Sequence, residues 1–260
     1  MTYDLIFQNL NFAHKIDEGP VFSEIFEEHF HLLYEIIFLV DGDVELVLEN
    51  KLYHLGVGDM IFIQPGQHHV VYPNPKRKYE RFVIKFPEEM ISSSILEDLK
   101  QKPVTTTIKK SVLPELFYRL DWHYQNYKGN DIENIMLNVL NEILSYFLVL
   151  DKETEKKEIN YLNKNMEEVV EYINNNIEKD ITIKDICEQF HYSRSYICKE
   201  FTRCLQVPIK QYIRTKKILY ANSLIQSGMK PTEVYSLCGY NEYSTFYRNY
   251  LSIMGKAPGA

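Results

Sequence analysis

The spacing of hydrophobic residues along the 260-residue chain changes from a strand pattern to a helical pattern. Between residues 21 and 86, short runs of β-branched and aromatic residues alternate with turn sequences such as Pro65-Gly66. Four of these runs lie at residues 35–40, 44–48, 60–63 and 81–86. Many short strands at this spacing predict a small antiparallel barrel or sandwich.

A helical period begins at about Phe86. Residues 88–100, 113–127 and 132–150 have apolar side chains at helical spacing. The last segment has a wide apolar face that extends from Ile132 to Leu148. Two interpretations of this face stay open, because it can pack against the barrel and part of it can form a dimer interface. The N-terminal part is therefore predicted to be a barrel with a helical layer.

The charged sequence DKETEKKE at residues 151–158 marks a domain boundary. Such a run is typical of a solvated linker. We therefore predict an N-terminal arm at residues 1–20, a β-rich domain at 21–150, a linker at 151–163 and an all-α domain at 164–260. The fold class is α+β, and the all-α domain is expected to begin with a helix at about 165–177.

Two similar patterns follow one another in the helical domain. The first is ITIKDICEQFHYSRSYICKEF at residues 181–201, and the second is PTEVYSLCGYNEYSTFYRNY at 231–250. Each has a short amphipathic run, a tight turn and a second run that begins with Ser and aromatic residues. This is the layout of a helix-turn-helix, whose second helix can enter a DNA major groove. Residues 209–225 read as one long helix that joins the two units.

The first unit shows which face of its second helix is outward. Ser193 is the expected N-cap. Ile197 and Phe201 are four residues apart and should face the core. Ser195, Cys198, Lys199 and Thr202 should then face outward.

The second unit repeats this layout less regularly. Gly239 supplies its turn, and Asn241 is the expected cap of its second helix. Phe246 and Tyr250 correspond to the buried pair of the first unit. Other faces of the helix then carry Tyr243, Ser244, Tyr247 and Arg248.

The charge is divided unevenly between the two domains. The whole chain has a formal net charge of −7, which is unusual for a protein that binds DNA. Residues 1–159 hold 16 Lys and Arg against 26 Asp and Glu, whereas residues 160–260 hold 13 against 10. Because this excess is small, phosphate contacts must come from local placement of basic side chains: Arg194, Lys199, Arg203, Lys210, Arg214, Lys216 and Lys217.

The helical domain resembles the AraC family of bacterial transcription regulators over roughly residues 165–260. The residues that carry the resemblance are Ser193, Tyr196, Ile197, Phe201, Pro208, Tyr212, Ala221, Leu224, Val234, Gly239, Tyr240, Ser244, Phe246, Arg248, Tyr250, Gly255 and Pro258. Tyr235 departs from the family pattern, which usually has a small residue there, and His191 stands where Gly is frequent.

The resemblance implies that both second helices enter successive major grooves. Carried over by position, base contacts are expected from Ser195, Cys198, Lys199, Tyr243, Ser244 and Arg248. Lys and Arg suit guanine O6 and N7, whereas Ser accepts several bases. Arg194 and Arg203 are expected either to contact phosphates or to be ordinary solvated charges.

A second group of chemically active residues lies in the β-rich domain. His29, His31 and Glu35 project from one face if their strand is unbroken, and Gly42 follows them. This spacing resembles the first motif of the cupin superfamily. The second cupin motif is only partly present, as Gly58, Pro65, Gly66 and the pair His68-His69. The domain is therefore expected to be a cupin-like barrel.

Two interpretations of these residues stay open. Two imidazoles and a carboxylate can hold a divalent transition metal, and the ligands would be His29, His31, Glu35 and His69, with His68 as a substitute. Without a metal, which the resemblance does not require, the same groups line a pocket for a small effector. The effector residues are then His29, His31, Glu35, His68, His69, Tyr72 and Arg81.

These observations predict a transcription regulator whose promoter DNA binding is controlled by a small effector, such as a sugar, in the barrel. A homodimer is expected, and RNA polymerase is a further candidate partner. No signal peptide or membrane-spanning run is recognised, and four cysteines without a CxxC pair fit a reducing cytoplasm. The rival functions are a metal-dependent cupin enzyme, such as a dioxygenase or isomerase, and a sensor that has lost DNA binding.

Overall fold

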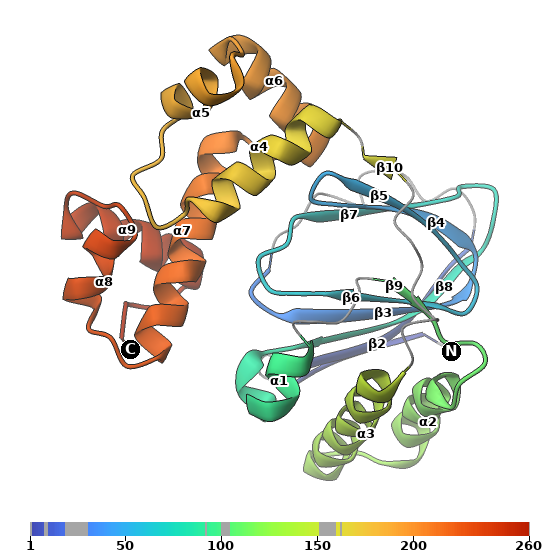
Figure 1. Cartoon of the computed structure of the whole chain (residues 1–260). Coiled ribbons are helices and arrows are strands. Elements are labelled where there is room, and N and C mark those ends of the chain that lie inside the picture. The colour runs from blue at the N-terminus through green and yellow to red at the C-terminus, as the bar shows by residue number, and fades with distance from the viewer. Residues whose placement is uncertain are drawn as a thin grey trace. The chain divides into compact units, whose positions relative to one another are not determined.

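A computed structural model describes residues 2–7, 10–18, 31–91, 93–99, 105–150, 160–161 and 163–259 (Figure 1). The chain divides into two compact units. The N-terminal unit comprises Met1–Val47 and Leu52–Ile159, and the C-terminal unit comprises Leu48–Lys51 and Asn160–Ala260. Most of the linker that we predicted at 151–163 lies outside the described residues.

The described part of the N-terminal unit contains two β-sheets and a helical layer. A six-stranded antiparallel sheet has the order β1-β2-β8-β3-β6-β9, and a second sheet contains β5, β4 and β7 in that order. The strands are β1 (Tyr3–Phe7), β2 (Leu10–Asp17), β3 (Tyr34–Asp41), β4 (Asp43–Leu48), β5 (Lys51–Gly56), β6 (Asp59–Ile63), β7 (His69–Pro73), β8 (Tyr79–Phe86) and β9 (Thr105–Thr107). The predicted antiparallel β architecture is confirmed.

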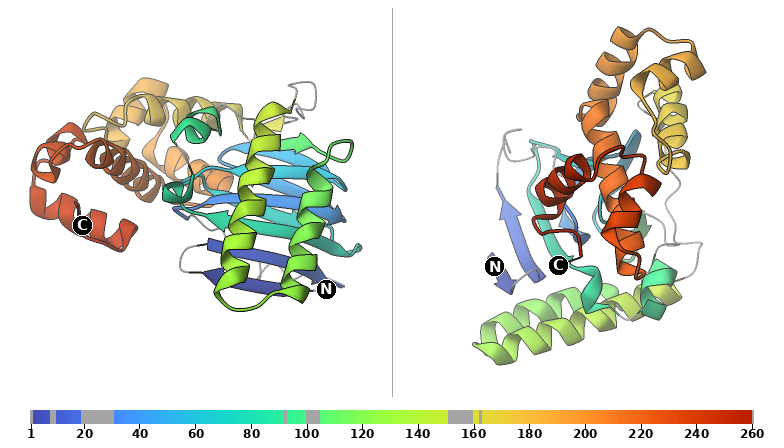
Figure 2. Two further views of the ribbon diagram at one scale, coloured as in Figure 1. Left: turned by 90° about the horizontal axis from the view of Figure 1, so that it is seen from below. Right: turned by 90° about the vertical axis from the view of Figure 1, so that its left-hand side faces the viewer.

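Helices α2 (Leu113–Asn126) and α3 (Asn130–Val149) lie side by side across one face of the six-stranded sheet (Figure 2). Aromatic side chains form this contact. The rings of Phe38 and Phe117 are 4.8 Å apart, and those of Phe62 and Phe147 are 5.5 Å apart. A short 3-10 turn (Glu88–Met90) and helix α1 (Ser93–Leu99) lie between β8 and β9 along the chain.

Helix α3 serves as the core helix of this unit. Its segment Asp131–Val149 is long and apolar enough to cross a membrane by length and composition alone. However, its apolar residues Met136, Leu140 and Ile143 are buried in the hydrophobic core with Phe12, Phe82 and other sheet residues. The packing interpretation of its wide apolar face is therefore confirmed.

Strand β3 explains why the residues after Glu35, from Ile36 to Val40, form an unbroken hydrophobic run. Tyr34, Ile36 and Phe38 are in the core that the sheet shares with the helices. Glu35 and the alternate residues point to the opposite face, because successive side chains of a strand alternate. Both faces are buried, so a strict hydrophobic–polar alternation is absent.

The N-terminal arm that we predicted at residues 1–20 is wrong for the described residues. Strand β2 pairs with β8 in register from Asn11 opposite Lys85 to Asp17 opposite Tyr79, and β1 pairs with β2. Leu10 and Phe12 are completely buried in the core. These residues are therefore a structural part of the sheet.

From Asn160 onward, the described residues of the C-terminal unit form the short strand β10 (Asn160–Tyr161) and then helices. Its helices are α4 (Lys164–Asn175), α5 (Ile183–Phe190), α6 (Arg194–Leu205), α7 (Ile209–Gln226), α8 (Pro231–Leu237) and α9 (Tyr243–Met254). Thr182 and Asp185 form a reciprocal capping box at the start of α5. Ser193 caps α6 by accepting a hydrogen bond from the Tyr196 amide, as predicted.

Two small hydrophobic cores lie on the long helix α7. Tyr212 and Ile213 pack into the first core with Ile197 and Phe201, the pair that we expected to be buried on α6. Further along α7, Ile218 and Ala221 pack into the second core, which includes Phe246 and Tyr250. Each helix-turn-helix unit therefore has its own core, and α7 belongs to both.

The second unit differs from the sequence prediction at its cap. Helix α9 begins at Tyr243, so its N-cap is Glu242 and not Asn241, and the Glu242 side chain makes no capping hydrogen bond. The unusual Tyr235 ring lies edge-on to Tyr243 at 5.7 Å. Tyr235 of α8 therefore packs against α9 at the edge of the second core.

His191 and Gly239 occupy equivalent turns with left-handed backbone conformations. Their φ angles are 55° and 69°. This geometry explains why Gly is frequent at the first position in the family. At Gly239 a Cβ atom would also lie 2.8 Å from the backbone of Lys179 and Asp180.

Replacing Gly239 with Ala should therefore destabilise the C-terminal unit through both backbone strain and steric overlap. Gly255 is the matched control, because its φ angle is 70° and a Cβ there would meet nothing within 4 Å. We expect Gly239→Ala to lower the free energy of unfolding by at least about 1 kcal/mol more than Gly255→Ala. Urea denaturation followed by circular dichroism measures this difference, and equal losses would contradict the packing at Gly239.

Candidate DNA interface and ligand site

The outward face of α6 carries the polar residues that the sequence placed there. Ser195, Lys199 and Thr202 are exposed, and Cys198 is half-buried. The opposite face is anchored by Ile197 and Phe201, which are completely buried. The rotation of α6 is thus set by its core side, and this rotation directs Ser195 and Lys199 to solvent.

The two arginines of α6 have different surroundings. Arg203 donates from Nε to the Glu200 carboxylate at 2.8 Å, and a second guanidinium nitrogen also pairs with it. Hydrogen bonds from Arg203 and then Asn163 hold the pKa of Glu200 below its usual value. Arg194 is exposed at the start of α6 and forms no ion pair with any residue that the structure describes. Arg194 is therefore more available than Arg203 for contact with an anion.

On α9 the exposed residues include Ser244, Tyr247 and Arg248, and further along the helix Leu251 and Ser252. Arg248 donates from Nε to the Ser244 carbonyl at 3.3 Å, which holds its side chain along the helix. Tyr243 is half-buried and packs on Phe246 as well as Tyr235. Tyr247 was missing from our predicted base contacts, although its position three residues after Ser244 placed it beside the outward stripe.

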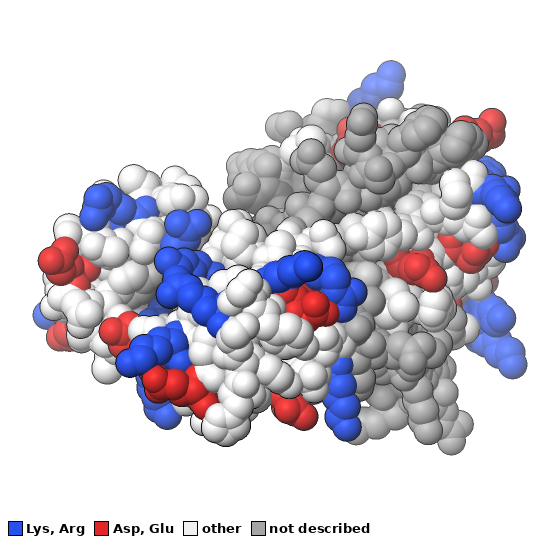
Figure 3. Space-filling model, turned by 90° about the horizontal axis from the view of Figure 1, so that it is seen from above, with Lys and Arg blue, Asp and Glu red and all other residues white. Residues whose placement is uncertain are grey.

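The basic side chains on the surface are distributed in local groups. On the face drawn in Figure 3, Lys and Arg side chains form several separate groups and not one continuous basic surface. Acidic side chains lie among them. This distribution agrees with the modest basic excess of the C-terminal sequence.

The candidate ligand site of the N-terminal unit is a cluster of His31, Glu35 and His69. Glu35 lies on β3, and His69 is the first residue of β7 in the second sheet. One Glu35 carboxylate oxygen lies 2.7 Å from His31 Nε2 and 3.1 Å from His69 Nε2. The other oxygen lies 3.4 Å from Lys85 Nζ. We call His31, Glu35 and His69 the His–Glu cluster.

Glu35 is an ionised carboxylate in a buried position. Burial alone raises the pKa of Glu35, but hydrogen bonds from His31 and His69 and the charge of Lys85 outweigh it. The pKa of Glu35 therefore lies well below its usual value. Lys85 was missed from the sequence, although it is the direct cross-strand partner of Glu35.

The two histidine rings are held by the backbone. A carbonyl oxygen only accepts hydrogen bonds, so His31 Nδ1 donates to the Leu33 carbonyl at 2.8 Å and His69 Nδ1 donates to the Gln67 carbonyl at 2.9 Å. Nε2 of each ring is thereby directed at Glu35. Metal-binding histidines are commonly oriented in this way, and a metal would replace the Nε2 protons that now face Glu35. The ligand atoms lie within 4.8 Å of one another, so the cluster fits a divalent transition metal.

The remaining predicted ligand residues are placed differently. His29 lies outside the described residues, and His68 is buried next to His69 but does not belong to the three-residue cluster. Arg81 pairs with Asp17 and lies over the Tyr79 ring at 4.1 Å. Tyr72 is 40% exposed and lines a groove of about 520 Å³ with His54 and Asn74. The lining of that groove does not include the His–Glu cluster.

Two protein-family models match the sequence. The model described as "AraC-like ligand binding domain" matches residues 23–127, which include the whole His–Glu cluster. The model described as "Helix-turn-helix domain" matches residues 186–260, which include α6 and α9.

Three curated relatives match most of the chain. Over 231 residues it is 22% identical to the uncharacterized HTH-type transcriptional regulator YdiP of Escherichia coli, covering 86% of this chain and 76% of the relative. Over 218 residues it is 20% identical to the lactose operon transcription activator of Staphylococcus xylosus, covering 82% and 77%. Over 246 residues it is 20% identical to the melibiose operon regulatory protein of Escherichia coli, covering 88% and 81%.

Proposed function

The chain belongs to the AraC family of transcription regulators, and we propose that α6 and α9 read two successive major-groove segments of its target promoter. The observation that carries this proposal is the exposure of polar stripes on both helices above two separate cores. In a helix-turn-helix the second helix supplies the base contacts. Here that helix is α6 in the first unit and α9 in the second.

Lys199 and Arg248 are the side chains best suited to discriminate between bases. Both are exposed, and both can donate to guanine O6 and N7. Ser195 and Ser244 beside them accept several bases, and Cys198 offers a weaker contact. We therefore assign guanine recognition to Lys199 in the first segment and to Arg248 in the second.

Lys199→Ala and Arg248→Ala should each lower discrimination between a selected operator and a scrambled duplex by about 1–3 kcal/mol, because each removes base-specific hydrogen bonds. Binding isotherms on both duplexes measure the effect. The operator is a duplex selected for tight binding from a random pool.

Lys76→Ala is the charge-matched control, since Lys76 is exposed in the turn between β7 and β8 of the N-terminal unit. It should leave discrimination unchanged. If neither Lys199→Ala nor Arg248→Ala lowers discrimination, the assignment of the reading helices is wrong.

For the effector, we propose a small hydroxylated molecule, such as a sugar, at the His–Glu cluster. A buried carboxylate and two imidazoles offer several hydrogen bonds to vicinal hydroxyl groups, and Glu35 is held in its charged, accepting form. Two relatives are named for sugar operons, those of lactose and melibiose. In this proposal the cluster recognises a ligand and carries out no catalysis.

A sugar that binds the cluster should stabilise the protein, by about 2.7 kcal/mol at a hundredfold excess over its Kd. Thermal unfolding with a panel of mono- and disaccharides measures this. Glu35→Gln should abolish the stabilisation, because it removes the charged acceptor between the two histidines. Glu115→Gln, an exposed carboxylate on α2, should retain it.

The same measurement with Mn²⁺ and Zn²⁺ separates the two interpretations of the cluster. Stabilisation by a metal ion, lost in Glu35→Gln, without stabilisation by any sugar would contradict the sugar proposal and identify a metal centre. Substrate turnover by the metal-loaded protein would instead favour the cupin enzyme.

We also propose that the outer face of α2 and α3 binds a second copy of the chain. Trp122, Tyr146 and Val149 are 54%, 41% and 75% exposed, although they are large and apolar. They belong to the two helices whose other sides cover the sheet, and Arg119 and Glu142 bridge these helices at 2.9 Å. Large apolar side chains exposed on one helical layer are candidates for an interface, and a two-fold contact lets each copy present the same surface.

Trp122→Glu should weaken self-association by about tenfold or more, because it places a charge in the centre of the apolar contact. Sedimentation velocity over a concentration series measures the dimer dissociation constant. Val57→Glu changes an equally exposed apolar residue in the turn between β5 and β6 and should have no effect. A wild-type protein that stays monomeric at high concentration would contradict the proposal.

A further inference from the structure

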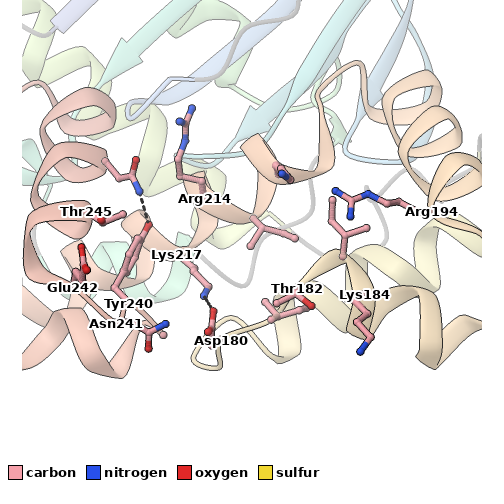
Figure 4. A pocket seen from close by; sticks show the side chains of 16 residues that line it. Asp180, Thr182, Lys184, Arg194, Arg214, Lys217, Tyr240, Asn241, Glu242 and Thr245 are labelled. Carbon is pink, nitrogen blue, oxygen red and sulfur yellow. Dashed lines mark hydrogen bonds and ion pairs between the residues drawn. The ribbon is translucent and has the colours of Figure 1, made fainter.

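A cleft of about 670 Å³ opens between the two helix-turn-helix units of the C-terminal unit. Figure 4 shows its lining, with Thr182, Lys184 and Arg194 from the first unit and Tyr240, Asn241 and Glu242 from the second. Helix α7 forms the floor between them. The volume lies within the range of ordinary ligand sites. Side chains from both reading units therefore border one space.

The floor of the cleft is a line of cations. Lys210, Arg214 and Lys217 are four and then three residues apart on α7, so they lie along one side of the helix. Lys210 and Arg214 are exposed, whereas Lys217 is only 6% exposed. The line thus extends from the surface to the bottom of the cleft.

These cations are only partly neutralised. Lys217 Nζ lies 3.7 Å from an Asp180 carboxylate oxygen, and the Asp180 side chain is 61% exposed. Lys210 and Arg214 form no ion pair with the residues that the structure describes, and neither does Arg194. Asp180 and Glu242 are the acidic residues in the lining, against Arg194, Lys210, Arg214, Lys217 and Lys184, the last of which also pairs with Glu188 at 3.6 Å. The cleft therefore favours an anion.

The surrounding helices add to this preference. The first residues of α5 and α6, Ile183 and Arg194, line the cleft, and Glu242 and Thr245 place the start of α9 there as well. The N-terminus of a helix carries a partial positive charge. Acidic side chains already stand at two of these termini, since Asp185 is in the capping box of α5 and Glu242 is the N-cap of α9. Arg194 at the start of α6 and the cations of α7 therefore supply most of the attraction for a phosphate group.

We propose that this cleft binds the phosphodiester backbone of the DNA strand that passes between the two major-groove segments, with Arg214 and Lys210 as the principal phosphate contacts. The inference rests on the proposed function, because the placement of α6 and α9 on either side of the cleft brings the backbone to it. A phosphate contact here fixes the register of both units but carries no sequence information.

Asp180 then acts as an internal substitute for the phosphate. In the free protein its carboxylate pairs with Lys217, whose pKa is lowered by burial. A phosphate at the mouth of the cleft adds a second negative charge near this ion pair and repels the exposed Asp180 carboxylate. Asp180 thus lowers the affinity of the free cleft for DNA, regardless of DNA sequence.

The proposal is tested by the salt dependence of DNA binding on a selected operator and on a scrambled duplex. Arg214→Ala should weaken binding to both duplexes by the same factor, and the slope of log K against log salt should fall by about 1. Asp180→Asn should strengthen binding to both. Lys230→Ala is the control, because Lys230 is exposed in the same unit but does not line the cleft.

Three results would overturn the proposal. One is a loss for Arg214→Ala on the operator alone, which would indicate a base contact. Another is a salt slope for Arg214→Ala equal to that of Lys230→Ala. The third combines two observations: calorimetry shows saturable binding of inorganic phosphate that Arg214→Ala abolishes, and the salt slope of DNA binding by Arg214→Ala equals the wild-type slope. That result would indicate a site for a small anion.

The failure of the cleft proposal is distinguishable from failure of the base-reading assignment. The cleft is judged by the salt slope on the scrambled duplex, whereas base reading is judged by the preference of Lys199→Ala and Arg248→Ala for the operator. Circular dichroism of each variant checks that the helices are retained. Arg214→Lys should restore most of the slope if a charge is what the phosphate requires.

Discussion

Helix α7 is the constraint on which the DNA-binding half of this protein depends. Its first turns pack Tyr212 and Ile213 into one core, and its later turns pack Ile218 and Ala221 into another. A single helix is stiff over its 18 residues, so the two cores are held at a fixed distance and rotation. The rotation of α6 and α9 is then set by Phe201 and Phe246, which are completely buried against these cores. The outward direction of Lys199 and Arg248 is a consequence of core packing.

A buried charge has the corresponding role in the N-terminal unit. An isolated carboxylate is costly to bury, and Glu35 is tolerated because two imidazoles and Lys85 surround it. These partners come from both sheets, since Lys85 lies on β8 and His69 on β7. The cluster therefore ties the sheets together at the point where a ligand would have to displace or join its hydrogen bonds. A ligand bound at Glu35, as proposed above, would thereby be physically linked to the packing of the two sheets.

Predictions from the sequence were correct where they depend on neighbouring residues and wrong where they depend on residues far apart in the chain. The Ser193 cap and the inward pair on α6 were correct because they depend on residues within one or two helical turns. The predicted arm was wrong because β2 pairs with β8 about seventy residues away, and no local signal reports such a pairing. Lys85 was missed for the same reason. Asn241 was a favourable cap by residue type, but the start of α9 is set by tertiary packing of Tyr243 and Phe246.

The two reading units are unequal in how they are held. Thr182 and Ser193 cap both helices of the first unit, and such caps typically contribute about 1 kcal/mol each. The N-cap residues of α8 and α9, Lys230 and Glu242, make no side-chain capping hydrogen bond. The second unit relies instead on α7 and on the close approach of Gly239 to Lys179 and Asp180. Since Asp180 is also the counter-ion of Lys217, the charge in the cleft and the seating of the second unit are coupled through one short segment. In the proposed mode of control, a ligand-driven change needs to shift only this uncapped unit to alter binding to a two-part site. The coupling is then bounded by the effector's differential affinity for the two states.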